Sequence, residues 1–188
     1  QRQADGPLLI TLGGTGSAPG DLGDLQQAAA ELGYHVIGVD YPNGVITTAC
    51  RGVPDHECFN KFRSEVGLGI PASDLVQVDV ENCIVRRIHR LLSYLKDNDP
   101  AGHWKKYVGE DSVDWREVVI AGHSQGSGHA AFLAKMFPMS RVILLSGPQD
   151  VAQWGVASWL RAEGATPVKN YFAFLHAGDV FGAEWQVR

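Results

Sequence analysis

The sequence carries little that would mark a membrane, nucleic-acid or metal-binding protein. No apolar run approaches the roughly 18 residues that a membrane helix needs. The formal net charge of −5 gives no reason to expect nucleic acid or an anionic membrane as partner. Neither a C-x-x-C pair nor a histidine pair with ligand spacing occurs, so no metal or other cofactor is predicted. With 188 residues, 45% of them apolar, we expect one globular domain with a sizeable core.

Cysteine is scarce as well, and the three that occur are unevenly placed. Cys50 and Cys58 lie eight apart in a polar segment, and Cys83 lies in an amphipathic one. This pattern predicts a Cys50–Cys58 disulfide with Cys83 free and buried, which is typical of a secreted or periplasmic protein. The alternative is a cytoplasmic enzyme with three unlinked thiols.

Both chain ends are expected to be cuts. The chain begins at Gln1 without a methionine or a signal peptide, and it stops at Arg188 without a tail-like composition. We expect either a processed protein or part of a longer product.

Apolar and amphipathic segments alternate along the chain. The expected strands cover residues 7–12, 34–40, 118–121, 141–146 and 171–176. The expected helices cover residues 21–32, 79–95 and 128–136, with a short one within 152–160. The alternation predicts a single α/β domain over residues 1–188, with a mostly parallel sheet and helices on both faces in a three-layer sandwich.

The segments between these elements carry further expectations. Asp21 is the expected N-cap of the first helix and Gly33 its C-terminal stop. Residues 41–75 are expected to form a long loop that shapes the substrate cleft, and residues 97–115 a second polar loop. Phe172 and Phe174 alternate as in a strand and are expected in the core.

The pentapeptide Gly122-His123-Ser124-Gln125-Gly126 is the most informative motif. It follows an apolar strand and precedes a helix, which is the context in which G-x-S-x-G forms a nucleophile elbow. The glycines on either side of Ser124 let strand and helix approach closely, because neither has a Cβ. A Gly/Ser-rich turn without chemistry is the alternative. The motif predicts that Ser124 is a nucleophile.

A nucleophilic serine also needs N–H donors for the oxyanion that forms on its substrate. One donor is the backbone N–H of the residue after the serine, here Gln125. The glycine loop at residues 13–16 follows an earlier strand and is suited to supply the second, with Thr15 favoured and Gly14 next. A plain flexible turn is the alternative reading of this loop, and a dinucleotide- or phosphate-binding loop is less favoured because neither G-x-G-x-x-G nor G-K-[ST] is complete.

The acid that orients a catalytic base has two candidates at the same edge of the sheet. Asp179 follows the strand predicted at 171–176 and is favoured, whereas Asp150 follows the strand predicted at 141–146. Tyr41, Trp154 and Trp159 are further candidates for the walls of a substrate pocket.

Over nearly its whole length the chain resembles an α/β-hydrolase-fold serine hydrolase. The matching pieces are Leu12-Gly13-Gly14-Thr15-Gly16, the elbow, and Phe174-Leu175-His176-Ala177-Gly178-Asp179. The Ser-Gln-Gly elbow is similar to that of cutinases and small carboxylesterases. The resemblance implies that Asp179 is the triad acid and that a histidine follows it.

No histidine follows Asp179 in this sequence. Three explanations compete: the histidine lies in a C-terminal piece beyond residue 188, one of the seven histidines present acts as base, or the protein lacks a base and is weakly active or inert. Among the seven, His176 could reach the sheet edge, whereas His123 is expected to pack locally and His129 to point away.

The sequence therefore predicts hydrolysis of a small-molecule or lipid-like carboxylic ester by Ser124, with no cofactor. An acyltransferase, thioesterase or amidase would use the same residues. A catalytically inert binding protein on a hydrolase scaffold is the alternative from another class.

Overall fold

The computed structural model of the chain describes residues 6–181, so the two expected cuts at its ends lie outside the described residues. The strands are β1 (Leu8–Leu12), β2 (His35–Val39), β3 (Val118–His123), β4 (Arg141–Leu145), β5 (Val151–Ala152), β6 (Gly155–Val156) and β7 (Tyr171–Phe174). The α-helices are α1 (Gly23–Glu31), α2 (Cys58–Leu68), α3 (Ile84–Asn98), α4 (Gln125–Met136) and α5 (Ser158–Arg161). The 3-10 helices are η1 (Thr47–Gly52), η2 (Pro100–Gly102), η3 (Trp104–Tyr107), η4 (Trp115–Glu117) and η5 (Val168–Asn170).

Five strands form one parallel sheet in the order β2-β1-β3-β4-β7. Strand β1 pairs with both β2 and β3, so Leu8 lies between His35 and Val118. The short pair β5–β6 is antiparallel and separate from this sheet. These findings confirm the predicted α/β class and its mostly parallel sheet. Because the strands are parallel, the loops that follow them all emerge at one edge.

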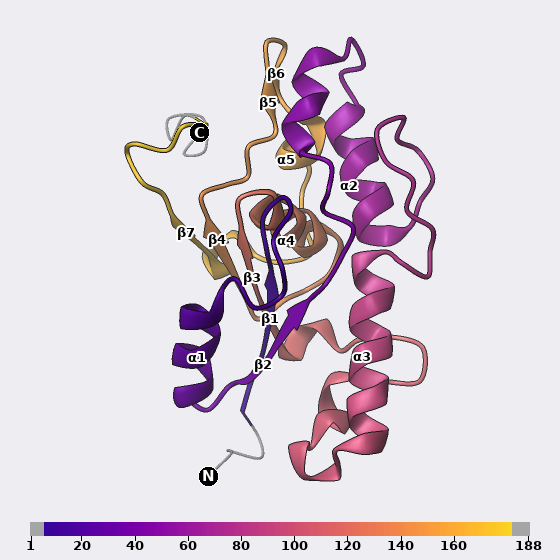
Figure 1. The fold of residues 1–188 in the computed structure, drawn as a ribbon, viewed down its shortest axis with the longest axis vertical. Helices are drawn as coiled ribbons and strands as arrows, with labels where there is room; N and C mark the ends of the chain where they lie inside the picture. The colour runs from indigo at the N-terminus through magenta and orange to yellow at the C-terminus, as the bar shows by residue number, and fades with distance from the viewer. Residues whose placement is uncertain (1–5, 182–188) are drawn as a thin grey trace.

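Alternating side chains of the strands point to two different packing layers. On one face Leu9 and Val119 pack against Ala29 of α1. On the other face Ile10 and Ile120 join the main core, which is completed by α2, α3 and α4. Figure 1 shows α1 on one side of β1 and β2 and α3 on the other. Helices thus cover both faces, as expected.

The segment from 41 to 75 differs from the expected loop, because it contains η1 and the eleven-residue helix α2. Phe59, Phe62 and Val66 of α2 are fully buried in the main core. Their spacing of three and four residues places them on one helical face. Polar and charged residues lie between them, so the segment as a whole looks polar and was predicted to be a loop.

Other element boundaries differ by a few residues. Helix α1 begins at Gly23, and the carboxylate of Asp21 accepts the N–H of Ala18 instead of capping the helix. Helix α3 begins only at Ile84, after Cys83 as its N-cap residue. The helix after the elbow begins earlier than expected, directly at Gln125.

Two other loop regions contain more structure than expected. Residues 97–115 include η2 and η3, and the aromatic side chains of Trp104, Tyr107 and Trp115 are buried. Residues 152–160 contain most of the β5–β6 hairpin, and the expected short helix is confined to their end, where α5 begins at Ser158.

Phe172 and Phe174 are not core residues. Their side chains are 45% and 66% exposed. Strand β7 is the last strand of the sheet, and α1 covers the other end of the same face. The alternating pattern correctly predicted a strand. It did not reveal that this strand is an outermost one, which pairs with β4 alone among the described strands.

A disulfide joins Cys50 of η1 to Cys58 at the start of α2, and Cys83 is a free, buried thiol. Both predictions about the cysteines are therefore confirmed. Within residues 6–181 no helix has the length and apolar character needed to cross a membrane.

Candidate functional site

Ser124 lies at the turn between β3 and α4, at the edge where the parallel strands end. Its backbone has φ 53° and ψ −119°, which a residue with a side chain rarely adopts. Strained backbone of this kind persists where the surrounding structure enforces it, and it occurs most often at functional sites. The turn leaves the Ser124 side chain partly exposed, whereas Gln125 is buried.

The two glycines of the motif are required by close backbone contacts. A Cβ on Gly126 would lie 2.2 Å from the carbonyl oxygen of Leu12. A Cβ on Gly122 would lie 2.2 Å from the carbonyl oxygen of Gly126. The absence of side chains therefore lets α4 begin directly against β1 and β3, as the motif predicted.

Hydrogen bonds hold the Ser124 backbone in place. Its N–H donates to the carbonyl of Leu145 at the end of β4, at 2.8 Å. Its carbonyl accepts from the hydroxyl of Ser127 at 2.7 Å and from the backbone N–H of Ser127 at 3.0 Å. The serine is thus tied to the neighbouring strand and to the first turn of the helix.

The glycine loop after β1 faces the elbow. A Cβ on Gly14 would lie 3.3 Å from the Cβ of Ser124, so this loop and the serine are in contact range. The hydroxyl of Tyr41 donates to the carbonyl of Gly13 at 2.6 Å, and the amide of Asn43 donates to the carbonyl of Gly14 at 3.1 Å. Tyr41 was expected to line the cleft. It is instead buried and supports the loop through its hydrogen bond to Gly13.

The two residues predicted to supply oxyanion donors touch one another. The hydroxyl of Thr15 donates to Oε1 of Gln125 at 3.0 Å. The same oxygen accepts from the backbone N–H and the hydroxyl of Thr47, at 2.8 and 3.0 Å. Three donors from two loops therefore fix the side-chain amide of Gln125.

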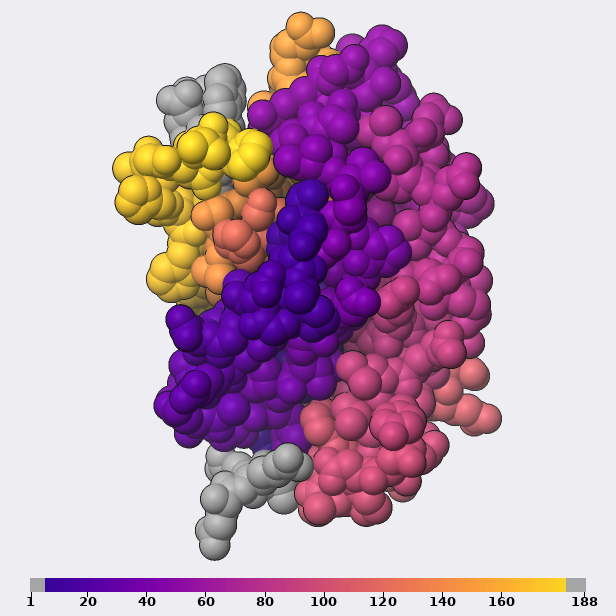
Figure 2. Space-filling view, viewed as in Figure 1, coloured from indigo at the N-terminus to yellow at the C-terminus, as the bar shows by residue number. Residues whose placement is uncertain are grey.

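A cleft of about 550 Å³ opens beside Thr15 and Ser124. Gly14, Thr15 and Ser124 line it, together with the polar side chains of Ser17, Asp21 and His123. In Figure 2 the indigo N-terminal segment and the yellow segment near the C-terminus lie on either side of coral and orange atoms from the middle of the chain. The large apolar side chains that line the cleft come from three different segments of the chain, and they are Leu22, Ile46 and Phe181.

Asp179 follows β7 at the same edge of the sheet but is not among the described residues that line the cleft. Its Oδ1 accepts the N–H of Phe181 at 2.9 Å, and its N–H donates to the carbonyl of His176 at 3.0 Å. The turn that contains Asp179 therefore brings Phe181 to the cleft.

Asp150, the second predicted acid, is fully buried and already engaged. Oδ1 accepts from Nη2 of Arg63 at 2.7 Å, and Oδ2 accepts from Nε of Arg63 at 3.0 Å. The indole N–H of Trp159 also donates to Oδ2, at 2.9 Å. This ion pair leaves Asp150 unsuited to orient a histidine. No local sequence pattern indicates this ion pair, because Arg63 and Asp150 lie 87 residues apart.

All seven histidines lie within residues 6–181, and no hydrogen bond joins any of them to Oγ of Ser124. His123 lines the cleft and is exposed, in contrast to the expected local packing. His176 is exposed, and its Nδ1 accepts the N–H of Gly178 at 3.0 Å. Among the described residues, these contacts therefore bring neither a histidine base nor the predicted acid Asp179 into contact with Ser124.

His129 is enclosed in the core of the protein. Its ring packs against Tyr41 and stacks on Phe62. Desolvation by burial, together with the charge of Arg63, holds its pKa well below the usual histidine value. His129 is therefore a neutral core residue, and it is not among the described residues that line the cleft, in line with the expectation that it points away.

The two tryptophans expected to line the substrate pocket make contacts elsewhere in the protein. Trp159 is buried against Phe132 and bonds to Asp150, and Trp154 stacks on His56. Neither lines the cleft beside Ser124. Among residues 6–181 no three histidine, cysteine or acidic side chains lie close enough together to hold a metal ion.

Comparison with known proteins adds no family to these observations. No protein-family model matches the chain, and no curated protein matches it.

Proposed function

We propose that this protein is a serine hydrolase of the α/β-hydrolase fold that cleaves carboxylic esters through an acyl-enzyme on Ser124. The observation that carries the proposal is the strained backbone of Ser124, with φ 53° and ψ −119°, between a parallel strand and a helix. Hydrogen bonds and two close-packed glycines enforce this conformation at the floor of a cleft. Backbone strain of this kind clusters at active sites and ligand-binding sites, which favours a functional role over a turn without chemistry.

The sheet supports the fold assignment. Strand β3, which leads into the elbow, lies in the middle of five parallel strands. Ligands of such sheets bind beyond the carboxyl ends of the strands, where the glycine loop, the elbow and Asp179 all lie. This placement is what an α/β-hydrolase site requires.

The proposed reaction begins when Oγ of Ser124 attacks the carbonyl carbon of the ester and loses its proton to a base. The negative charge that develops on the carbonyl oxygen is stabilised by the backbone N–H groups of Gln125 and Thr15. The C–O bond of the ester then breaks, and the alcohol leaves with the proton from the base. Water attacks the resulting acyl-enzyme in the same manner and releases the acid.

Asp179 is the proposed acid that orients the histidine base. It follows β7 at the edge where Ser124 lies, and its turn carries Phe181 into the cleft. The variants His123→Ala and His176→Ala test whether the base is one of the two histidines near this edge. Loss of Ser124 reactivity in one of them alone, with folding retained, would identify it.

The proposed substrate is a small ester with an apolar acyl group. Leu22, Ile46 and Phe181, from three different segments of the chain, supply apolar surface to a cleft of about 550 Å³. Polar side chains, among them Asp21, His123 and Ser124, line the same cleft, and this mixed lining suits a ligand with one carbonyl and an apolar remainder.

The proposed location is secreted or periplasmic. The Cys50–Cys58 disulfide is of a kind that forms and persists in oxidising compartments.

Reaction with a fluorophosphonate probe tests the proposed function. The folded protein is expected to acquire one adduct, on Ser124, and the Ser124→Ala variant none. A folded protein that does not react would instead favour a binding protein on a hydrolase-like scaffold.

A further inference from the structure

Arg63 is almost completely buried, with 1% of its surface exposed. Its guanidinium donates to three acceptors at once. Nε and Nη2 bond to the two carboxylate oxygens of Asp150 at 3.0 and 2.7 Å. Nη1 bonds to the backbone carbonyl of Gln125 at 2.8 Å. The third contact joins α2 directly to the residue that follows Ser124.

The elbow helix is shaped to admit this side chain. A Cβ on Gly128 would lie 2.0 Å from Nη2 of Arg63. A side chain at position 128 would therefore displace the guanidinium, so the glycine and the arginine fit one another.

Stability alone does not account for this arrangement. Burial of an ion pair costs several kcal/mol of desolvation per ion, and well-packed apolar residues of similar volume are often equally stable or more so. An apolar pair, however, supplies no donor to the carbonyl of Gln125. The charge of Asp150 compensates for that of Arg63, and the guanidinium still has an N–H group for the elbow.

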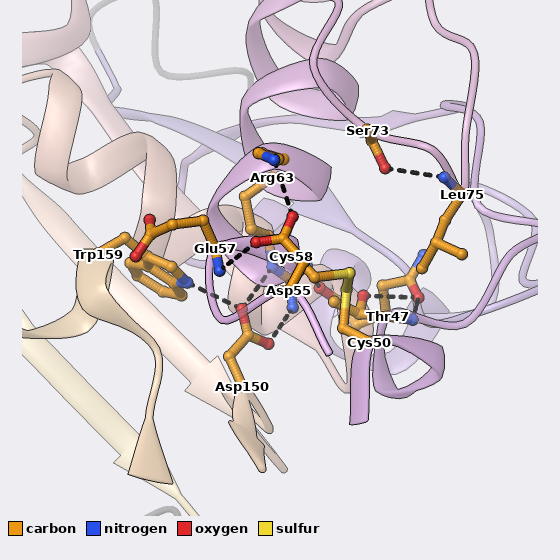
Figure 3. Close-up of a disulfide and its surroundings, with 12 residues drawn as sticks. Thr47, Cys50, Asp55, Glu57, Cys58, Arg63, Ser73, Leu75, Asp150 and Trp159 are labelled. Carbon is orange, nitrogen blue, oxygen red and sulfur yellow. Dashed lines mark hydrogen bonds and ion pairs between the residues drawn. A yellow bond between two sulfur atoms is a disulfide. The ribbon is translucent and has the colours of Figure 1, made fainter. Parts of the chain in front are cut away.

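The disulfide ties together the two segments that hold Gln125. Cys58 begins α2 and lies five residues before Arg63, whereas Cys50 lies in η1 with Thr47. Thr47 holds the side-chain oxygen of Gln125, and Arg63 holds its carbonyl. Figure 3 shows Asp150 between Trp159 and this disulfide-linked region. Gln125 is thus fixed at both its side chain and its backbone.

We propose that Arg63 is a positioning residue, which sets the place of Gln125 and so the direction of the oxyanion donor beside Ser124. The proposal rests on the proposed function, because it assigns Arg63 a role in that same site. Arg63 itself touches no substrate. An oxyanion donor acts mainly in the transition state, so its displacement lowers kcat and leaves KM nearly unchanged.

The test compares ester hydrolysis and fluorophosphonate labelling in matched variants. In Arg63→Met/Asp150→Asn both charges disappear together, and an oxygen remains at position 150 for Trp159. We expect a folded protein whose kcat for p-nitrophenyl butyrate is lower by about ten- to a hundredfold, because small displacements of catalytic groups cost this much. KM is expected to stay within about twofold.

Two further variants keep the test decisive if the double variant does not fold. Arg63→Lys keeps a positive charge beside Asp150 but lacks the guanidinium, whose N–H groups bond to Asp150 and Gln125 at once. It is expected to lower kcat, as the double variant does. Glu65→Gln, on the same helix, removes a buried carboxylate that bonds to Ala72, Ser73 and Val78 rather than to the elbow. It is expected to reduce thermal stability without changing kcat of the folded protein.

The outcomes separate the two claims. A folded wild type that neither hydrolyses esters nor labels at Ser124 overturns the proposed function, and this proposal with it. An active wild type whose Arg63 variants keep kcat within about twofold overturns the positioning role alone. A loss of kcat in Glu65→Gln as large as in Arg63→Lys would likewise overturn it, because general destabilisation would then explain both.

Discussion

The hydroxyl of Thr15 donates a hydrogen bond to Oε1 of Gln125 at 3.0 Å, although the two residues lie 110 positions apart in the sequence. The contact joins the loop after β1 to the first residue of α4. It therefore connects the two segments that carry the proposed oxyanion donors.

Thr15→Val removes this hydrogen bond and keeps the shape of the side chain. Because one such bond contributes about 1 kcal/mol, the rate of Ser124 labelling is expected to fall roughly fivefold. Thr15→Ser keeps a hydroxyl and is expected to lie closer to wild type. Equal rates in the valine and serine variants would show that the contact does not support the site. The measurement is the second-order rate of fluorophosphonate labelling.

Gly126→Ala tests the close approach of α4 to β1. The added Cβ would lie 2.2 Å from the carbonyl oxygen of Leu12 and 2.4 Å from that of Gly13. We expect the free energy of unfolding to fall by about 1–3 kcal/mol, as is typical when an extra group is added to a well-packed core. Gly20→Ala is the matched control, since a Cβ there has no atom within 4 Å. Urea denaturation of both variants measures the difference, and equal stabilities would contradict the packing described.

Loss of the disulfide is expected to lower the free energy of unfolding by about 2–3 kcal/mol, because the bond closes a short loop and so reduces the conformational entropy of the unfolded chain. The variant for this test is Cys50→Ser/Cys58→Ser. Reductant should lower the thermal midpoint of the wild type and of Cys83→Ser, but not that of the double variant. A midpoint that reductant leaves unchanged in the wild type would indicate that the bond contributes nothing to stability.

The carboxylate of Glu65 makes stability depend on pH. Burial raises its pKa, but hydrogen bonds from the backbone N–H groups of Ser73, Ala72 and Val78 outweigh burial, so the pKa lies below the usual 4.5. Since the folded-state pKa is lowered, this stabilisation is present above pH 4.5 and is lost as the pH falls through the folded-state value.

Glu65→Gln is therefore expected to be less stable than wild type at neutral pH, and the gap should narrow in acid. Denaturation curves at neutral pH and below pH 4.5 measure that gap. A gap of constant size at both pH values would contradict the assignment.

Local sequence patterns predicted the framework of this protein. The strands and the elbow follow from apolar runs and from glycines at fixed spacing, and both signals lie within a few residues. The Cys50–Cys58 bond was predictable for the same reason, because its loop is short. Even so, α2 was missed, since the polar residues Asn60 and Lys61 separate its buried residues Phe59 and Phe62.

Long-range contacts were not predictable in this way. Arg63 lies in a segment that the sequence predicted to be a polar loop, and only the folded chain brings it to Asp150 and to the carbonyl of Gln125. The edge position of Phe174 likewise depends on the order of the strands rather than on their composition.

The most direct test of the proposed function is intact-mass analysis of the folded protein after reaction with a fluorophosphonate. We predict one adduct per chain, located on Ser124 by peptide mapping and absent from Ser124→Ala. A folded wild type without an adduct, or with an equal adduct in Ser124→Ala, would contradict the assignment of Ser124 as the nucleophile.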